Sequence, residues 1–170
     1  MSAITGTPNI LAFSISRYQF GFFLPEVAQL CVETTISAVP FSHLSMAGLL
    51  CHEDLPPIPI FDIQCILEGG PARPSVPGAQ IILADSSGGN VGLRMNRLLG
   101  TFALPENTRI EPLQPSERAD LPPLLRSVCQ SKTQLEAIGT VFFFSPAVFL
   151  QQIDQQLAEK QAKNLYLAEK

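Results

Sequence analysis

The sequence has little charge, few histidines and no long apolar run. Only 15% of its 170 residues are charged and 46% are hydrophobic, a balance that excludes a disordered chain and supplies a core. The net charge of −4 argues against sequence-independent nucleic-acid binding, because that affinity comes from cations that neutralise phosphates. The longest apolar stretch, around Val141–Phe144, is far too short to span a bilayer.

Signatures of metal binding and catalysis are also missing. The four cysteines are widely spaced without a CxxC pair, and the only histidines are His43 and His52, so we predict no metal site. The phosphate-binding GxxxxGK[ST], dinucleotide GxGxxG, hydrolase GxSxG and zinc HExxH motifs do not occur. We therefore expect no cofactor and no enzymatic activity.

The N-terminal sequence MSAITGTPNILAF lacks the basic start and the unbroken apolar run of a secretory signal. We therefore expect a soluble cytoplasmic protein. Reduced, buried or half-buried thiols are the usual state of cysteines in that compartment.

Fifteen prolines and eleven glycines predict short strands and turns before the C-terminus. Apolar runs bounded by turn residues predict strands at Ile10–Ile15, Phe20–Leu24, Val27–Glu33, Ile58–Ile63, Ile81–Ala84, Val91–Met95, Leu98–Leu104, Thr108–Leu113 and within Leu135–Phe144. The Ser86–Gly89 turn predicts a hairpin between two of them. Ser42–Leu50 is expected to form a short helical turn capped by Ser42, and Glu111–Pro123 a surface loop.

Two segments set the expected boundaries. The stretch EGGPARPSVPG (Glu68–Gly78) predicts a linker, with approximate subdomains at 10–67 and 79–144. Ser145 and Pro146 are an N-cap and first-turn pair, and Phe149, Ile153 and Leu157 then repeat every four residues. An amphipathic helix is therefore predicted at 146–163, and the spacing of the strands predicts an all-β barrel or sandwich fold.

Two groups of polar residues are candidates for a functional site. His52, Glu53 and Asp54 form a compact charged loop, but adjacent residues of an extended chain point in opposite directions and cannot easily share one metal ion. A solvated or partner-binding loop is the alternative. Asp62 ends a strand, where a carboxylate most often caps the next turn, here Gln64–Leu67.

The order of several short elements resembles the CheW-like domain, the coupling module of bacterial chemosensory arrays. Val39-Pro40, then Gly48, then Pro59-Ile60-Phe61-Asp62-Ile63 match the first half of that pattern. Val91-Gly92-Leu93-Arg94-Met95 and Ile110-Glu111-Pro112 match the second half. The resemblance runs from about Ile10 to Ile153. It departs where Cys51–Asp54 replaces an Arg-Gly loop and where Asn96 replaces an aspartate.

The resemblance implies an all-β fold of two five-stranded SH3-like β-barrels with a C-terminal α-helix. It also implies a non-enzymatic adaptor that couples a chemoreceptor signalling tip to the regulatory domain of a two-component histidine kinase. Since the replaced loop is acidic, we expect a partner with a basic counterpart. The residues expected at the partner-binding surface are Val39, Pro40, Met46, Leu49, Leu50, His52, Glu53 and Asp54.

Two alternatives stay open. One is a structural module with a replaced partner or a self-association role through the C-terminal helix. The other is a small enzyme acting through His52 or Cys51.

Overall fold

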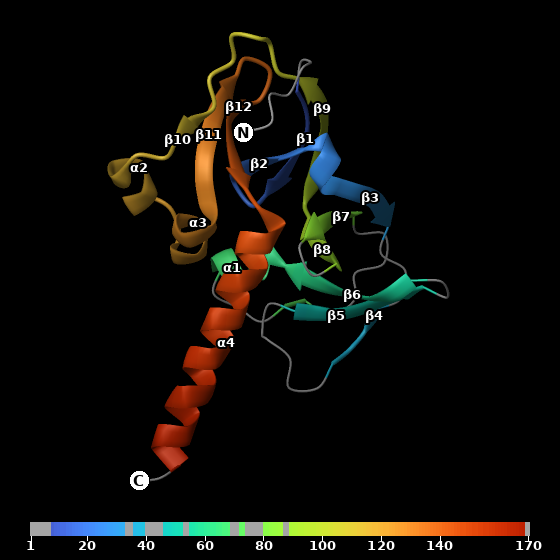
Figure 1. Cartoon of the computed structure of the whole chain (residues 1–170), viewed down its shortest axis with the longest axis vertical. Coiled ribbons are helices and arrows are strands. Elements are labelled where there is room, and N and C mark those ends of the chain that lie inside the picture. The colour runs from blue at the N-terminus through green and yellow to red at the C-terminus, as the bar shows by residue number, and fades with distance from the viewer. Residues whose placement is uncertain are drawn as a thin grey trace.

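Two six-stranded β-sheets form the body of the protein, and a long helix, α4, begins beside them (Figure 1). The structure is a computed structural model that describes residues 8–32, 36–39, 46–52, 55–68, 72–73, 80–86 and 89–168. Sheet A has the strand order β10 (Glu111–Pro112), β11 (Cys129–Leu135), β12 (Gly139–Phe144), β2 (Tyr18–Phe23), β1 (Asn9–Ile15), β9 (Arg97–Ala103). Sheet B has the order β3 (Val27–Val32), β7 (Gln80–Ser86), β8 (Gly89–Met95), β6 (Leu55–Asp62), β5 (Met46–His52), β4 (Ile36–Ser37).

Each sheet consists of five strands of six to eight residues and one strand of two residues, β4 or β10. Apart from one parallel contact in each sheet, the neighbouring strands run antiparallel. The prediction of an all-β fold with two SH3-like barrels is confirmed. The predicted hairpin is also present, since β7 pairs with β8 from Gln80↔Met95 to Ser86↔Gly89.

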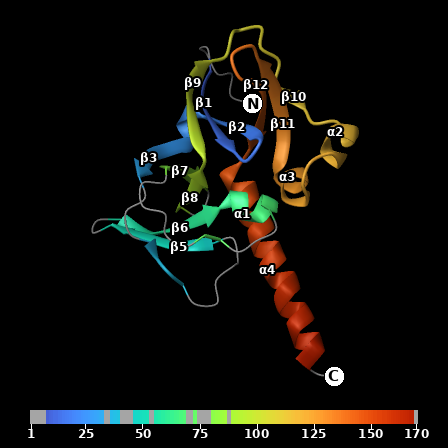
Figure 2. The same cartoon turned by 180° about the vertical axis from the view of Figure 1, so that it is seen from behind.

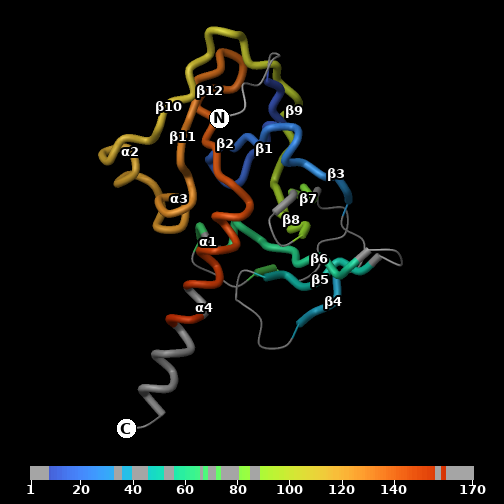
Figure 3. Tube along the Cα trace, viewed as in Figure 1, coloured from blue at the N-terminus to red at the C-terminus, as the bar shows by residue number. Residues whose placement is uncertain are grey.

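The sheets do not follow the two halves of the chain. β1 and β2 join β9 to β12 in sheet A, whereas β3 to β8 form sheet B. The chain crosses from sheet A to sheet B through the short helix η1 (Leu24–Glu26) and returns at Asn96, between β8 and β9 (Figure 3). The approximate subdomains 10–67 and 79–144 therefore do not coincide with the two sheets.

Three apolar clusters follow from the alternation of side chains along the strands. Leu11, Phe13 and Ile15 on one face of β1 belong to the largest cluster, which also contains residues of β7, β8 and α4. Ile10 and Ala12, on the opposite face, belong to a smaller cluster of sheet A. A third cluster lies within sheet B and consists of Leu50, Ile58, Ile60, Ile81 and Leu83. The largest cluster thus joins the two barrels.

The C-terminal helix α4 (Pro146–Ala168) begins where the Ser145-Pro146 pair predicts it. Its first turn is closed by the Phe149 N–H, which donates to the Ser145 carbonyl at 3.0 Å. Phe149 and Ile153 are buried in the largest cluster, called the central cluster below. The Phe149 ring meets Phe61 of β6 edge-on, with 5.4 Å between the ring centroids. The view from behind shows α4 starting beside α1 (Ile63–Glu68) (Figure 2). The apolar stripe of this helix therefore anchors it across the junction of the sheets.

Two predictions of local structure were wrong. Residues 46–50 form part of β5 and not a helical turn, because pairing with β6 outweighs local preference; Ser42 lies outside the described residues. The short strand β10 lies within the predicted strand Thr108–Leu113, but the expected loop Glu111–Pro123 also contains the helix α2 (Pro115–Ala119). The last strand, β12, lies within Leu135–Phe144 as predicted, but the strand β11 that pairs with it and the helix α3 (Pro123–Val128) before β11 were not predicted.

Candidate functional site

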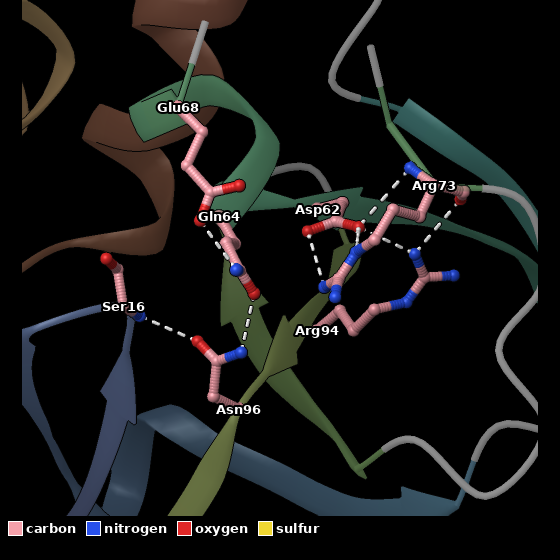
Figure 4. Close-up of polar contacts among 7 residues, drawn as sticks. All are labelled: Ser16, Asp62, Gln64, Glu68, Arg73, Arg94 and Asn96. Atoms are coloured by element: carbon pink, nitrogen blue, oxygen red, sulfur yellow. Dashed lines mark hydrogen bonds and ion pairs between the residues drawn. The ribbon is translucent and has the colours of Figure 1, made fainter. Parts of the chain in front are cut away.

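Where β8 passes into β9, a series of hydrogen bonds connects the β1–β2 turn of sheet A to the helix α1 (Figure 4). Asn96 Oδ1 accepts from the Ser16 N–H of the β1–β2 turn at 2.6 Å, and Asn96 Nδ2 donates to Gln64 Oε1 of α1 at 2.5 Å. Gln64 Nε2 then donates to Glu68 Oε1 at 2.6 Å. Ser16 has a positive φ of 54°, so the turn that Asn96 holds is a constrained one. Asn96, where the family pattern has aspartate, therefore links sheet A to α1.

A buried ion cluster lies on the other side of α1 (Figure 4). Asp62 and Arg94 are cross-strand neighbours on β6 and β8, and their side chains are 0% and 1% exposed. Arg94 Nη1 donates to Asp62 Oδ2 at 2.8 Å. Arg73 binds both carboxylate oxygens, Nε to Oδ2 at 2.8 Å and Nη2 to Oδ1 at 3.1 Å. One carboxylate thus holds two guanidinium groups.

The cluster also fixes the backbone that connects α1 to β7. The Arg73 carbonyl accepts from Arg94 Nη1 at 3.1 Å, so the two arginines are joined directly. Arg73 lies within the segment 68–78 that the sequence predicts to be an exposed linker, and its side chain is 42% exposed. The predicted linker is therefore anchored to the barrel at Arg73.

The ionisation of this cluster follows from its contacts. Burial alone would raise the pKa of the Asp62 carboxyl, but hydrogen bonds from Arg73 and Arg94 outweigh it and hold that pKa below its usual value. Burial and the adjacent Asp62 carboxylate raise the pKa of the Cys65 thiol. Asp62 therefore stays ionised while Cys65 stays protonated. Asp62 does precede a helical turn, as predicted, but its main partners are the two arginines.

Three exposed apolar side chains, named the apolar strip below, lie on η1 (Leu24) and on one face of β3 (Leu30 and Val32). These side chains are 37%, 41% and 58% exposed and, with Ile110, are the exposed large hydrophobic residues of the described chain. Leu30 pairs in register with Ile82, which is buried in the central cluster. The strip therefore borders the junction of the two sheets on the crossover from sheet A to sheet B. β3 also contains no charged residue, although it lies at the end of its sheet.

Five of the eight residues expected at the partner-binding surface are described, and they lie on β5 or after β4. Val39 is half-buried after β4, and Met46 and Leu49 are half-buried on β5, Met46 against the central cluster. Leu50 is 2% exposed and fills the core of sheet B. His52 ends β5. Pro40, Glu53 and Asp54 lie outside the described residues. The set therefore combines a core side chain with accessible ones.

The thiols and acids of the described residues form no metal site. No three His, Cys, Asp or Glu side chains gather there closely enough to hold an ion. Cys65 and Cys129 are buried and Cys31 is half-buried, but Cys51 is exposed, contrary to the expectation that every thiol is at least half-buried. Within the described ranges, no helix is long and apolar enough to cross a membrane.

Sequence reasoning missed the ion cluster and the apolar strip, although both leave a signal. Ile58, Ile60 and Asp62 alternate on one face of β6, as Gly92 and Arg94 do on β8. A carboxylate on one strand and a guanidinium on another, both on buried faces, predict an ion pair between them, because a buried charge needs a partner. Leu30 and Val32 alternate on a strand whose Cys31 faces the core of sheet B. The sequence pattern of the strands alone does not tell which face of a sheet is covered.

Comparisons with known proteins agree with the fold. No family model matches the chain, and no curated protein matches it. Among solved structures, the crystal structure of the scaffolding protein TtCheW from Thermoanaerobacter tengcongensis is similar, with a TM-score of 0.69 at 17% sequence identity. The match covers 85% of this chain and 92% of that one. The resemblance to the CheW-like domain is therefore confirmed at the level of the fold.

Proposed function

We propose that this chain is a non-enzymatic adaptor of a bacterial chemosensory pathway, coupling a chemoreceptor to a two-component histidine kinase. The CheW-like fold supports the scaffolding role, since the structural neighbour is a scaffolding protein. The resemblance implies that a receptor coiled coil is received in a groove between the barrels. The observation that carries the proposal is the apolar strip of Leu24, Leu30 and Val32 at the junction of the two sheets.

The strip has the chemistry that a receptor helix requires. A helix that lies in a groove buries an apolar face, read as residues three and four apart. Leu30 and Val32 offer two exposed apolar side chains two residues apart on one strand, about 7 Å along it. Because β3 carries no charge, docking such a helix there buries no unpaired ion.

The kinase contact is assigned to the β5 region. Val39, Pro40, Met46 and Leu49 would supply contact area, and His52, Glu53 and Asp54 would set partner choice through their charge. Leu50 would contribute by holding β5 in place, because it is buried in the sheet.

The test is a titration of the full chain against the regulatory domain of a chemosensory histidine kinase from the same genome, with and without a receptor signalling tip. Micromolar binding to both supports the adaptor function. Leu30→Glu should weaken receptor binding about tenfold or more and leave kinase binding unchanged. Ile110→Glu is the matched control, since Ile110 is 38% exposed but lies outside the strip. Binding to neither partner would refute the proposal.

The alternative is self-association through the same surface. β3 lies at the end of sheet B and exposes apolar side chains, an arrangement that lets a second strand pair with it. Sedimentation over a range of concentrations separates the two functions. An adaptor without its partners stays a monomer, whereas a self-associating module changes size with concentration and loses that change in Leu30→Glu.

A further inference from the structure

The buried ion cluster on β6 and β8 holds one residue, Arg73, by its side chain and by its backbone. Asp62 accepts two hydrogen bonds from the Arg73 guanidinium, Nε to Oδ2 at 2.8 Å and Nη2 to Oδ1 at 3.1 Å. Asp62 Oδ2 also accepts from the Arg73 backbone N–H at 3.4 Å, and the Arg73 carbonyl accepts from Arg94 Nη1 at 3.1 Å. Two side chains therefore bind the guanidinium, the N–H and the carbonyl of a single residue (Figure 4).

Asp62 and Arg94 are fixed parts of sheet B, whereas Arg73 lies outside its strands. The parallel pairing of β6 with β8 aligns Asp62 with Arg94, and their side chains are 0% and 1% exposed. Arg73 has no regular secondary structure, and its side chain is 42% exposed. Water and salt screen an exposed ion pair, so its contribution to stability is small. The two buried side chains thus form a prearranged site, and Arg73 can leave that site at a small cost in free energy.

The geometry of this site selects arginine and a particular kind of backbone. A guanidinium presents Nε and Nη2 side by side and binds both oxygens of one carboxylate, whereas lysine offers a single nitrogen. The hydrogen bonds to the N–H and the carbonyl of residue 73 require backbone groups that are not already paired within a helix or a sheet. The ligand that fits is therefore an arginine in an extended or irregular segment.

We propose that Asp62 and Arg94 form a binding site for such an arginine of a protein partner, and that Arg73 occupies this site when the partner is absent. The partner's arginine makes the hydrogen bonds that Arg73 gives up, so Asp62 and Arg94 end the exchange with equivalent contacts. Because Arg73 lies in the connection between α1 and β7, its release also detaches this connection from β6 and β8. The site is separate from the apolar strip, and the proposal does not depend on the adaptor function.

The first test is an NMR titration of the isotopically labelled full chain carrying Arg73→Ala. The ligand is acetyl-Ala-Arg-Pro-amide, which has the sequence of residues 72–74. We expect millimolar binding with shifts at Asp62 and Arg94. The control peptide, acetyl-Ala-Lys-Pro-amide, keeps the charge and the backbone but lacks the planar fork, so it should bind about tenfold more weakly. Adding Asp62→Leu and Arg94→Met replaces the site with apolar side chains and should abolish binding of the arginine peptide.

The second test measures the exchange in the unchanged chain. Since Arg73 competes for the site, the arginine peptide should bind about fivefold more weakly than it binds Arg73→Ala. The Nε–H signal of Arg73 should shift as the peptide takes its place. Absence of binding to Arg73→Ala, or equal binding of the two peptides, would overturn the proposal. Binding to Arg73→Ala alone, or binding to the unchanged chain without a shift at Arg73, would also overturn it. None of these outcomes bears on the Leu30→Glu test of the adaptor function.

Discussion

Replacing Asp62 by asparagine tests whether the buried ion cluster holds sheet B together. The substitution preserves size and one acceptor oxygen but removes the charge that both arginines share. Arg94 then keeps its charge on a side chain that is 1% exposed but loses the Asp62 carboxylate. Leaving a buried charge without its partner costs about 3–5 kcal/mol, a large part of the total stability of a domain.

The other members of the cluster should respond by smaller amounts. The Arg73 side chain is 42% exposed, so water and ions screen its contact with Asp62, and Arg73→Ala should cost about 1 kcal/mol or less. The double variant Asp62→Leu, Arg94→Met replaces the pair with apolar groups. It should recover most of the loss, because a buried pair and a packed apolar pair are often similar in stability.

Urea unfolding followed by circular dichroism measures these differences, with thermal unfolding as a second assay. For a chain of this length, Asp62→Asn should lower the unfolding midpoint by about 6–20 °C. If Arg73→Ala destabilised the protein as much as Asp62→Asn, exposure would not govern the cost and the reasoning would be wrong. A double variant as unstable as the single one would refute the role of the unpaired Arg94 charge.

Four further predictions follow from the same contacts. The unchanged protein should be more stable than Asp62→Asn above the usual carboxyl pKa of about 4. This difference in unfolding free energy should shrink as the pH falls from about 4 through the lowered pKa of Asp62, and urea midpoints at each pH measure it. Gly92→Ala should destabilise by about 1–3 kcal/mol, because its Cβ would lie 2.2 Å from Ile60 Cδ1; Ile60→Val, which removes that methyl, should restore part of the loss in the same unfolding assay. A thiol reagent should label the exposed Cys51 first and Cys129 only on unfolding, since burial raises the pKa of Cys129 to about 12. Glu53→Lys with Asp54→Lys should weaken kinase binding, and unchanged affinity would exclude that loop from the contact.

The sequence predicted the elements whose signals are local. The β7–β8 hairpin is set by apolar runs around a glycine-containing turn, and α4 by a Ser-Pro start and a four-residue repeat. β5 was mistaken for a helical turn because its residues become a strand only by pairing with β6. β11 was missed because it is largely polar, with Cys129, Thr133 and Leu135 as its buried residues. Local preference alone cannot predict such strands.

The candidate site was harder to predict because its parts are distant in the sequence. Asp62 and Arg94 are 32 residues apart, and Ser16 and Asn96 are 80 apart. Their meeting depends on the parallel pairing of β6 with β8 and on the return of the chain to sheet A at Asn96. Neither the β6–β8 pairing nor the return of the chain at Asn96 leaves a local pattern in the sequence. A family resemblance supplies the topology but not these side chains.

The exchange of strands between the sheets bears on how the protein folds. Cutting the chain within 68–78 would leave β1 and β2 without β9 and β12, their neighbours in sheet A, and β6 without β8. Each fragment would then expose apolar strand faces and open edges that the intact chain covers. The same segment carries Arg73, so a cut before Arg73 would also separate its ion pair with Asp62. Neither half can therefore complete its own sheet, so the two barrels must fold as one cooperative unit, with α1 held between Asp62 on one side and Asn96 on the other.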